Sequence, residues 1–248
     1  MKLTVLGCSG TFPGPDSGCS SYLLQDEGFT LLVDAGSGAV GELQRHVDLL
    51  GVDAVFLSHL HADHCLDLVS YTYARRYDPA GTPPALPVHG PEGTCERLTQ
   101  AGGWSDADGL QAVYEFTDVH AGTTEIGPFR VDLARMNHPV VCHGARFTSG
   151  GSSLTYSGDT GWSDALVELA RGTDAALFEA TWYNGDANPP GVHLTAREAG
   201  QHAAAAQVER LLLTHVTPWG DRDRTLAEAA GAFSGAAEVV SRGTAYDI

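Results

Sequence analysis

Four residues of metal-ligand type stand within six positions of this chain. The run His59-Leu60-His61-Ala62-Asp63-His64 supplies three imidazoles and one carboxylate. In an extended segment, residues two apart point the same way, so His59 and His61 can hold one ion together. Asp63 and His64 follow and can face a neighbouring ion. Because imidazole with carboxylate suits Zn²⁺, Mn²⁺ or iron, we expect two divalent ions that activate water, with Zn²⁺ as the first choice and Mn²⁺ as the alternative.

One loop cannot complete two metal sites, so further ligands must come from elsewhere. Three candidates follow apolar runs that predict strands: His138, Asp159 and His215. A lone loop histidine is more often a surface residue, and the prediction therefore rests on the set. A carboxylate such as Asp159 can bridge two ions about 3.5–4 Å apart. His143, five residues after His138, is a weaker candidate for lining the site.

The elements that must position these residues alternate along the chain. The metal run directly follows the apolar segment 54–57, so it lies at the carboxyl end of a predicted buried strand. Thr195 and Glu198 form a capping box at the start of a helix. We expect strands at 3–6, 21–24, 29–33, 54–57, 86–89, 113–116, 129–134, 145–148, 153–156, 175–178 and 211–213. We expect helices at 39–46, 66–76, 91–100, 164–170 and 195–207.

This order predicts an α/β fold in which two sheets pack face to face with helices outside. The Pro/Gly-rich break at 78–84 is too short for a domain boundary, so we expect a single domain over 1–248.

Charge and composition restrict the partners. With 14 basic and 31 acidic residues the formal charge is −17, which disfavours non-specific binding to nucleic acid or to an anionic membrane. No stretch approaches the roughly 20 apolar residues of a membrane span, and no signal-peptide core is present near the start. The five cysteines lack zinc-finger or CxxC spacing. We therefore expect a cytoplasmic protein with reduced thiols and no membrane partner.

In these motifs the chain resembles the metallo-β-lactamase-fold superfamily. The resemblance spans nearly the whole chain and rests on the metal run, Asp34, His138, the segment Ser157-Gly158-Asp159-Thr160 and the segment Leu213-Thr214-His215. It implies a four-layer αββα sandwich. It assigns one ion to His59, His61 and His138. It assigns the second to Asp63, His64 and His215, with Asp159 bridging. Asp34 would hold a ligand histidine, although a turn-forming Asp at a strand end explains it equally well.

Within that superfamily the chain resembles the ribonuclease Z branch. The evidence is Phe178-Glu179-Ala180-Thr181 followed by Val192-His193-Leu194. In that branch the glutamate orients the histidine, which assists at the phosphate. The resemblance therefore implies Glu179, His193 and Asp63 as catalytic residues, although His193 could be only a neighbour of the Thr195 cap. Segments 3–10, 14–17, 57–68 and 214–219 resemble actinobacterial cyclic-nucleotide phosphodiesterases more closely still.

One departure from ribonuclease Z is informative. That family usually inserts a long arm that grips tRNA between the positions matching His138 and Asp159, whereas only about 20 residues separate them here. The best basic pair elsewhere is Arg75-Arg76. We therefore expect a small phosphodiester, with a cyclic nucleotide favoured over tRNA. Trp182, Tyr183 and Trp219 are the candidates to line a base-binding slot. Homodimers are common among ribonuclease Z relatives, and a homodimer is possible here.

Rival functions remain open. A ribonuclease Z-like tRNA 3′-end endonuclease is one, and a glyoxalase-like thioester hydrolase is another, although such hydrolases do not typically carry the Glu179/His193 pair. A metal-loaded interaction module without activity is the non-enzymatic alternative, but such proteins usually lose ligands and none is missing here.

Overall fold

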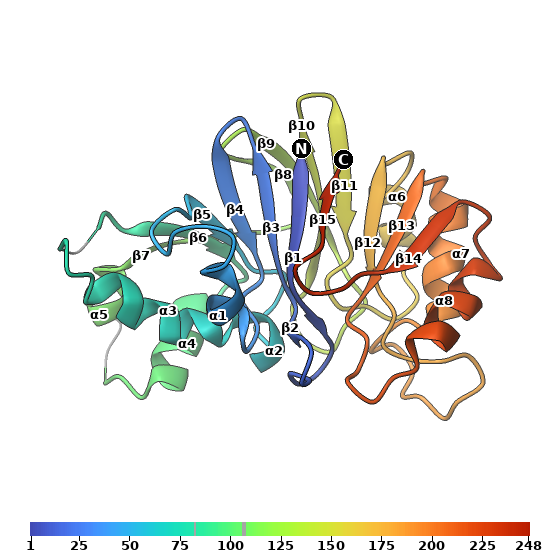
Figure 1. The fold of residues 1–248 in the computed structure, drawn as a ribbon, viewed down its shortest axis with the longest axis horizontal. Helices are drawn as coiled ribbons and strands as arrows, with labels where there is room; N and C mark the ends of the chain where they lie inside the picture. Colours follow the sequence, from blue (N-terminus) through green and yellow to red (C-terminus); the bar gives the residue numbers. More distant parts are fainter. Residues whose placement is uncertain (82, 106–107) are drawn as a thin grey trace.

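Two β-sheets packed face to face form the centre of the protein, and helices cover their outer faces. The computed structural model describes residues 1–81, 83–105 and 108–248. Figure 1 shows α1, α3, α4 and α5 on one side of the paired sheets and α6, α7 and α8 on the other. The predicted four-layer αββα sandwich is thereby confirmed. The Pro/Gly-rich segment 78–84 includes residue 82, which lies outside the described residues.

The first sheet contains the N-terminal half of the chain together with its last strand. Its order is β15-β1-β3-β4-β5-β6-β7, with β2 beside β1. The strands are β1 (Lys2–Ser9), β2 (Gly18–Cys19), β3 (Ser21–Asp26), β4 (Phe29–Val33), β5 (Ala54–Phe56), β6 (Leu86–Gly90), β7 (Tyr114–Asp118) and β15 (Ala245–Asp247). From β4 to β7 the neighbours run parallel, so their carboxyl ends meet at one edge of the sheet.

The second sheet contains the remaining strands in the order β14-β13-β12-β11-β10-β9-β8. They are β8 (Gly122–Ile126), β9 (Phe129–Arg135), β10 (His143–Ser149), β11 (Ser152–Tyr156), β12 (Ala175–Glu179), β13 (Arg210–Thr214) and β14 (Ala236–Val239). The strands from β11 to β14 are parallel, whereas β8 to β11 form antiparallel pairs.

The helices are α1 (Ala39–Leu43), α2 (Ala62–Cys65), α3 (Asp67–Arg76), α4 (Thr94–Gly102), α5 (Asp108–Gln111), α6 (Asp164–Leu169), α7 (Ala196–Ala206) and α8 (Arg222–Ala230). The capping box predicted at Thr195 and Glu198 is present at the start of α7. The helix predicted over 39–46 ends earlier, at Leu43, because residues 44–46 turn away exposed and bury no apolar face. None of the described helices combines the length and apolarity that a membrane span requires.

Strands buried on both faces explain the continuous apolar runs of the sequence. In β4, Leu31 and Val33 belong to the core between the two sheets, whereas Leu32 packs toward the helices. In β12, Leu177 faces the first sheet and Phe178 faces α6 and α7. Neighbouring side chains point to opposite faces of a strand, so both faces must be apolar in the middle layers of this fold.

His202 in α7 offers a test of how the outer layer is stabilised. Its ring is fully buried, and Nδ1 donates to the Glu198 carbonyl oxygen at 2.7 Å while Nε2 accepts from the Ser163 backbone N–H at 3.1 Å. This arrangement requires a neutral imidazole. Burial accordingly lowers the pKa of His202 below its usual 6.5.

We predict that His202 makes the stability of the folded protein depend on pH. In the unfolded chain the imidazole takes up a proton as pH falls below about 6.5, but in the folded chain it does not. Its stabilising contribution is therefore complete above that pH and is lost as pH falls. Urea unfolding should show a larger stability gap between wild type and His202→Gln at pH 7.5 than at pH 5.5. An equal gap at both values would contradict the prediction.

Candidate metal centre

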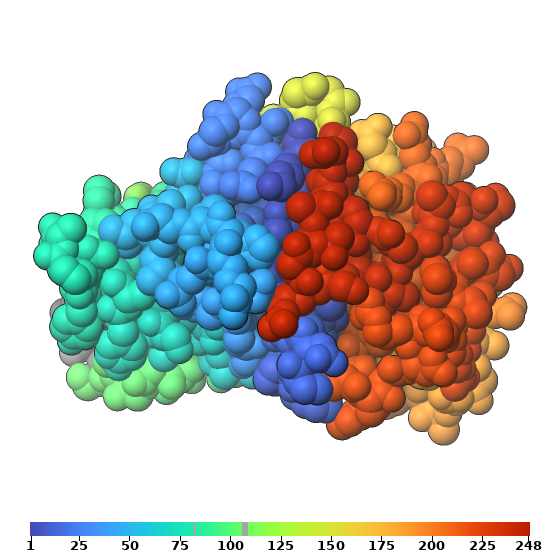
Figure 2. Space-filling view, in the orientation of Figure 1, coloured from blue at the N-terminus to red at the C-terminus, as the bar shows by residue number. Residues whose placement is uncertain are grey.

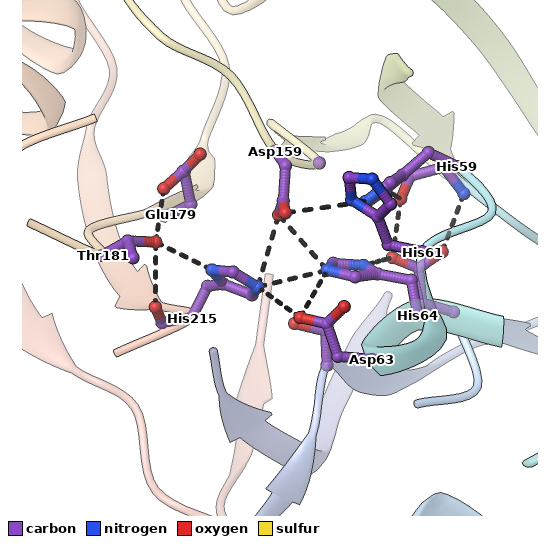
Figure 3. Close-up of polar contacts among 12 residues, drawn as sticks. His59, His61, Asp63, His64, Asp159, Glu179, Thr181 and His215 are labelled. Atoms are coloured by element: carbon purple, nitrogen blue, oxygen red, sulfur yellow. Dashed lines mark hydrogen bonds and ion pairs between the residues drawn. The ribbon is translucent and has the colours of Figure 1, made fainter. Parts of the chain in front are cut away.

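All seven residues predicted as metal ligands lie together where the two sheets meet. The ligand atoms of His59, His61, His138 and Asp159 lie within 4.8 Å of one another. Those of Asp63, His64, Asp159 and His215 form a second such cluster. Asp159 belongs to both, and Figure 3 shows its carboxylate between His59 and His61 on one side and His215 on the other.

Both sheets contribute to these clusters through loops that follow strands. After β5 the chain passes through His59 to His61, which precedes α2 in an extended conformation with φ −66° and ψ 154°. Asp63 and His64 then lie in α2 itself. From the second sheet, His138 follows β9, Asp159 follows β11 and His215 follows β13. The expectation that these residues follow the ends of apolar strands therefore agrees with their positions in the structure.

The geometry of the nitrogens fits bound cations. His61 Nδ1 lies 3.1 Å from His59 Nε2 and 3.2 Å from His138 Nε2, and His64 Nε2 lies 3.2 Å from His215 Nε2. Only one proton can occupy the space between two such nitrogens, so unused lone pairs converge. Asp159 Oδ1 is buried and has no hydrogen-bond partner among the described residues. Divalent ions would satisfy these atoms together, so the donor set fits the metals that the sequence predicts.

Four of the five ligand histidines have one ring nitrogen hydrogen-bonded to a group outside the clusters, which fixes how these rings point. Because one nitrogen of each of these four rings is used in this way, the other is left for a metal. The pairs are His138 Nδ1 with the Val192 carbonyl oxygen at 2.8 Å, His64 Nδ1 with Asp34 Oδ2 at 2.7 Å, His215 Nδ1 with Thr181 Oγ1 at 2.8 Å and His59 Nδ1 with Ser58 Oγ at 3.1 Å.

Asp34 is fully buried and orients two of these rings. It contacts the ring of His64 directly and that of His59 through the Ser58 hydroxyl. Oδ2 accepts from His64 Nδ1 at 2.7 Å, from Ser58 Oγ at 2.8 Å and from the Tyr156 hydroxyl at 2.7 Å. Oδ1 accepts from the Ser58 backbone N–H at 2.7 Å. Asp34 has a left-handed backbone with φ 55°. It is thus both a turn residue at the end of β4 and the acceptor for His64, so the two interpretations of the sequence describe one residue.

The charges of the clusters oppose one another. Burial raises the pKa of Asp159, but His215, His64 and His59 outweigh it and hold that pKa well below its usual value. Burial lowers the pKa of His59 well below 6.5, and repulsion from His64 adds to this effect. An ionised carboxylate is thus surrounded by imidazoles, at least one of which stays neutral and able to bind a metal.

Glu179 and His193 form a hydrogen-bonded pair beside the clusters. Glu179 is buried at the end of β12 and accepts from His193 Nδ1 at 3.0 Å, from the Thr160 N–H at 2.6 Å and from the Thr181 hydroxyl at 2.7 Å. Because both oxygens of the Glu179 carboxylate accept hydrogen bonds, we interpret the grouping of Glu179, His193 and His215 as a positioning network rather than a third metal site. Burial lowers the pKa of His193, but Glu179 outweighs it and raises the pKa to about 9.

The three aromatic candidates for contacting substrate lie together in one cleft, whereas His143 does not line it. Trp182, Tyr183 and Trp219 line one cleft of about 320 Å³ together with Thr181. His143 begins β10 and lies outside the three clusters. Burial lowers its pKa, as do Arg135 and His120, and its Nδ1 contacts no hydrogen-bond partner in the described parts of the chain. A contact of His143 with substrate stays a prediction.

Sequence reasoning missed two groups that support the ligands. The backbone N–H of Thr11 donates to Asp63 Oδ2 at 2.8 Å across 52 positions of the chain. Thr181 joins Glu179 to His215 through its hydroxyl. Thr181 lies within the motif that carries Glu179 and could have been found there. A backbone donor such as Thr11 leaves no signal in its residue type.

Comparison with known proteins agrees with the fold. The family model of the β-lactamase superfamily domain matches residues 30–216. The chain therefore belongs to the β-lactamase superfamily, and within it to the class of metal-dependent hydrolases.

Individual relatives narrow the comparison. A protein of Mycobacterium leprae is 42% identical over 253 residues, covering 100% of this chain and 89% of the relative. The crystal structure of the metallo-β-lactamase fold protein YhfI from Bacillus subtilis superposes with a TM-score of 0.89 at 29% identity, covering 99% of both chains. A ribonuclease Z of Mycobacterium bovis is 30% identical over 275 residues, covering 96% of this chain and 95% of the relative.

We predict that Asp34→Asn weakens zinc binding about 10- to 100-fold, the usual effect of losing a carboxylate that orients a ligand histidine. Asparagine tolerates the left-handed backbone, so the change removes the charge and one acceptor with little strain. Competition with a chromophoric chelator measures the affinity. Asp174→Asn is the control, because Asp174 accepts from Ser153 N–H at 2.6 Å and from its hydroxyl at 2.7 Å away from both clusters. Equal losses in both variants would refute the role of Asp34.

Proposed function

We propose that the chain is a dinuclear-metal phosphodiesterase that hydrolyses a small phosphodiester, with a cyclic nucleotide as the expected substrate. The observation that carries this proposal is the Glu179–His193 pair placed against the two clusters. His193 Nδ1 lies 3.8 Å from Asp159 Oδ2, and its side chain is 13% exposed. A hydrolase that only had to activate water would not need this additional oriented imidazole.

The ligand assignment follows the clusters. His59, His61 and His138 would hold one ion, Asp63, His64 and His215 the other, and Asp159 would touch both. Zn²⁺ is the expected ion and Mn²⁺ the alternative. When bound, such a pair supplies an activated water and offsets the charge of a phosphate. Asp63 is additionally proposed to act in catalysis, because the Thr11 N–H fixes its carboxylate at the edge of the site.

His193 has a distinct role in this proposal. Because Glu179 accepts from Nδ1, the ring is held with Nε2 as the nitrogen that can face a substrate. From there it can donate a hydrogen bond to a phosphate oxygen or a proton to the departing alcohol oxygen. Glu179 acts through His193 and stays inaccessible itself, since it is fully buried.

Two features favour a small diester over tRNA. The segment between His138 and Asp159 forms only the hairpin of β10 and β11, so it holds no inserted arm. The formal charge of −17 opposes binding of a polyanion. The ribonuclease Z-like alternative therefore ranks second. Glyoxalase-like thioester hydrolysis ranks third, because it leaves the Glu179–His193 pair without a purpose.

The decisive experiment is hydrolysis of cyclic AMP and of bis(p-nitrophenyl) phosphate by metal-free protein with added Zn²⁺ or Mn²⁺. We expect metal-dependent turnover of both. Turnover of the artificial diester alone would retain the phosphodiesterase and exclude the cyclic nucleotide. If neither is cleaved while two ions are bound, the phosphodiesterase is excluded, and a thioester and a precursor tRNA test the rivals.

We predict that His193→Ala lowers kcat about 100- to 10,000-fold, the usual contribution of general acid–base catalysis. Its zinc content should match that of wild type, since His193 lies outside both four-residue ligand clusters. Turnover of bis(p-nitrophenyl) phosphate and elemental analysis measure the two quantities. His46→Ala, which removes a histidine bonded only to Glu42, should leave both unchanged. Loss of zinc from His193→Ala would refute the catalytic role.

A further inference from the structure

The exposed Trp219 packs against the half-buried Phe12, and neither the fold nor the proposed chemistry gives this aromatic pair a role. Trp219 is 78% exposed, and its ring lies 4.5 Å from that of Phe12 at an interplanar angle of 44°. Figure 2 shows the blue loop after β1 meeting the orange-red chain at the lower edge of the molecule. An indole this exposed can offer a face of its ring to a planar ligand.

Both rings are attached to the metal clusters through very short segments. Phe12 directly follows Thr11, whose N–H donates to Asp63 Oδ2 at 2.8 Å. Trp219 lies four positions after His215. Gly10 allows this approach, because a Cβ there would lie 2.5 Å from the His215 carbonyl oxygen. The pair is thus fixed relative to two predicted ligands.

A cleft beside the metal clusters is lined by both Trp219 and Thr181, and the Thr181 hydroxyl contacts His215 Nδ1 at 2.8 Å. The cleft has a volume of about 320 Å³, near the lower end of the roughly 300–1,000 Å³ range of small-molecule sites. Its remaining walls are mostly polar and include Thr11, Asp186, Asn188 and Thr217.

Trp219 is the most exposed of the cleft aromatics. Trp182 is half-buried, and its ring packs edge-on against His193 with centroids 5.0 Å apart. Tyr183 is covered by the Arg224 guanidinium at 4.1 Å from its centroid, and its hydroxyl donates to the Asp221 carbonyl oxygen. Of the three aromatic candidates, Trp219 therefore offers the most accessible ring for a planar group to stack on.

We propose that Phe12 and Trp219 form a stacking platform for the nucleobase of the substrate. This inference rests on the proposed phosphodiesterase function and deepens it. The phosphodiester lies at the metal clusters, and the base lies flat on the indole, which Phe12 supports from the N-terminal loop. A nucleobase fits because it combines a π-face with a polar edge, matching an aromatic end wall and polar side walls. An aliphatic group would leave those polar walls unpaired.

The test compares a diester that carries a base with one that does not. In Trp219→Ala the KM for 3′,5′-cyclic AMP should rise roughly tenfold with kcat retained, as expected for loss of one base–aromatic stack. Trp219→Phe should recover most of the affinity, and Phe12→Ala should raise KM less than Trp219→Ala. Turnover of trimethylene cyclic phosphate, a six-membered cyclic diester without any aromatic ring, should stay unchanged in all three variants when followed by phosphorus NMR. Tyr77→Ala removes an equally exposed aromatic, 69% accessible, outside the cleft and serves as the matched control.

The outcomes separate this inference from the proposed function. An equal loss on both diesters in Trp219→Ala would show a structural role and overturn the platform, as would an unchanged KM for cyclic AMP. If wild type cleaves neither diester, the phosphodiesterase fails, and saturation-transfer NMR with adenosine tests the platform alone. Transfer to the base protons in wild type and Tyr77→Ala, lost in Trp219→Ala, supports it. Equal transfer in all three proteins, or none in wild type, overturns it.

Discussion

Four hydrogen bonds converge on the carboxylate of Asp34, which is inaccessible to solvent, and they join parts of the chain that are far apart in sequence. The donors come from the loop after β5, from α2 and from Tyr156 in the second sheet. Hydrogen bonds to a buried charge are each worth about 1.5–3 kcal/mol, and a lost acceptor leaves buried donors unsatisfied. Asp34 therefore holds the first sheet, the second sheet and the ring of His64 in one arrangement.

The metal centre exists only where the sheets are packed correctly. His59, His61, Asp63 and His64 come from the first sheet, and His138, Asp159 and His215 come from the second. Neither set alone forms the two clusters. A divalent ion held by residues from both sets would stabilise the packing of the two sheets, because a ligand that binds this arrangement and not the unfolded chain shifts the equilibrium toward it.

The sequence was sufficient to predict the layers and the residues that cluster where the sheets meet, because both depend on local patterns. Apolar runs that end on His59, Asp159 or His215 identify strands and their polar ends without any knowledge of distant contacts. Short edge strands such as β2 and β15 were missed, because two or three residues carry no periodicity. Thr11 was also missed, because its backbone N–H contributes only after the loop has folded onto Asp63. His138 and His143 lie five positions apart, and the sequence alone does not show which of them reaches the clusters. In the structure His138 belongs to a cluster, whereas His143 begins β10 and lies outside all three.

The Thr11–Asp63 contact also divides the N-terminal loop by its tolerance of substitution. The donor at position 11 is a main-chain group, so mutation to any residue except proline preserves it, although the φ of 68° favours residues that tolerate left-handed geometry. The next residue, Phe12, has no such bond to a predicted ligand in the described part of the chain, so its side chain can change without removing a contact to the metal clusters. A lineage could therefore acquire new substrates by drift at the loop tip and at Trp219, with the hydrolytic machinery inherited intact.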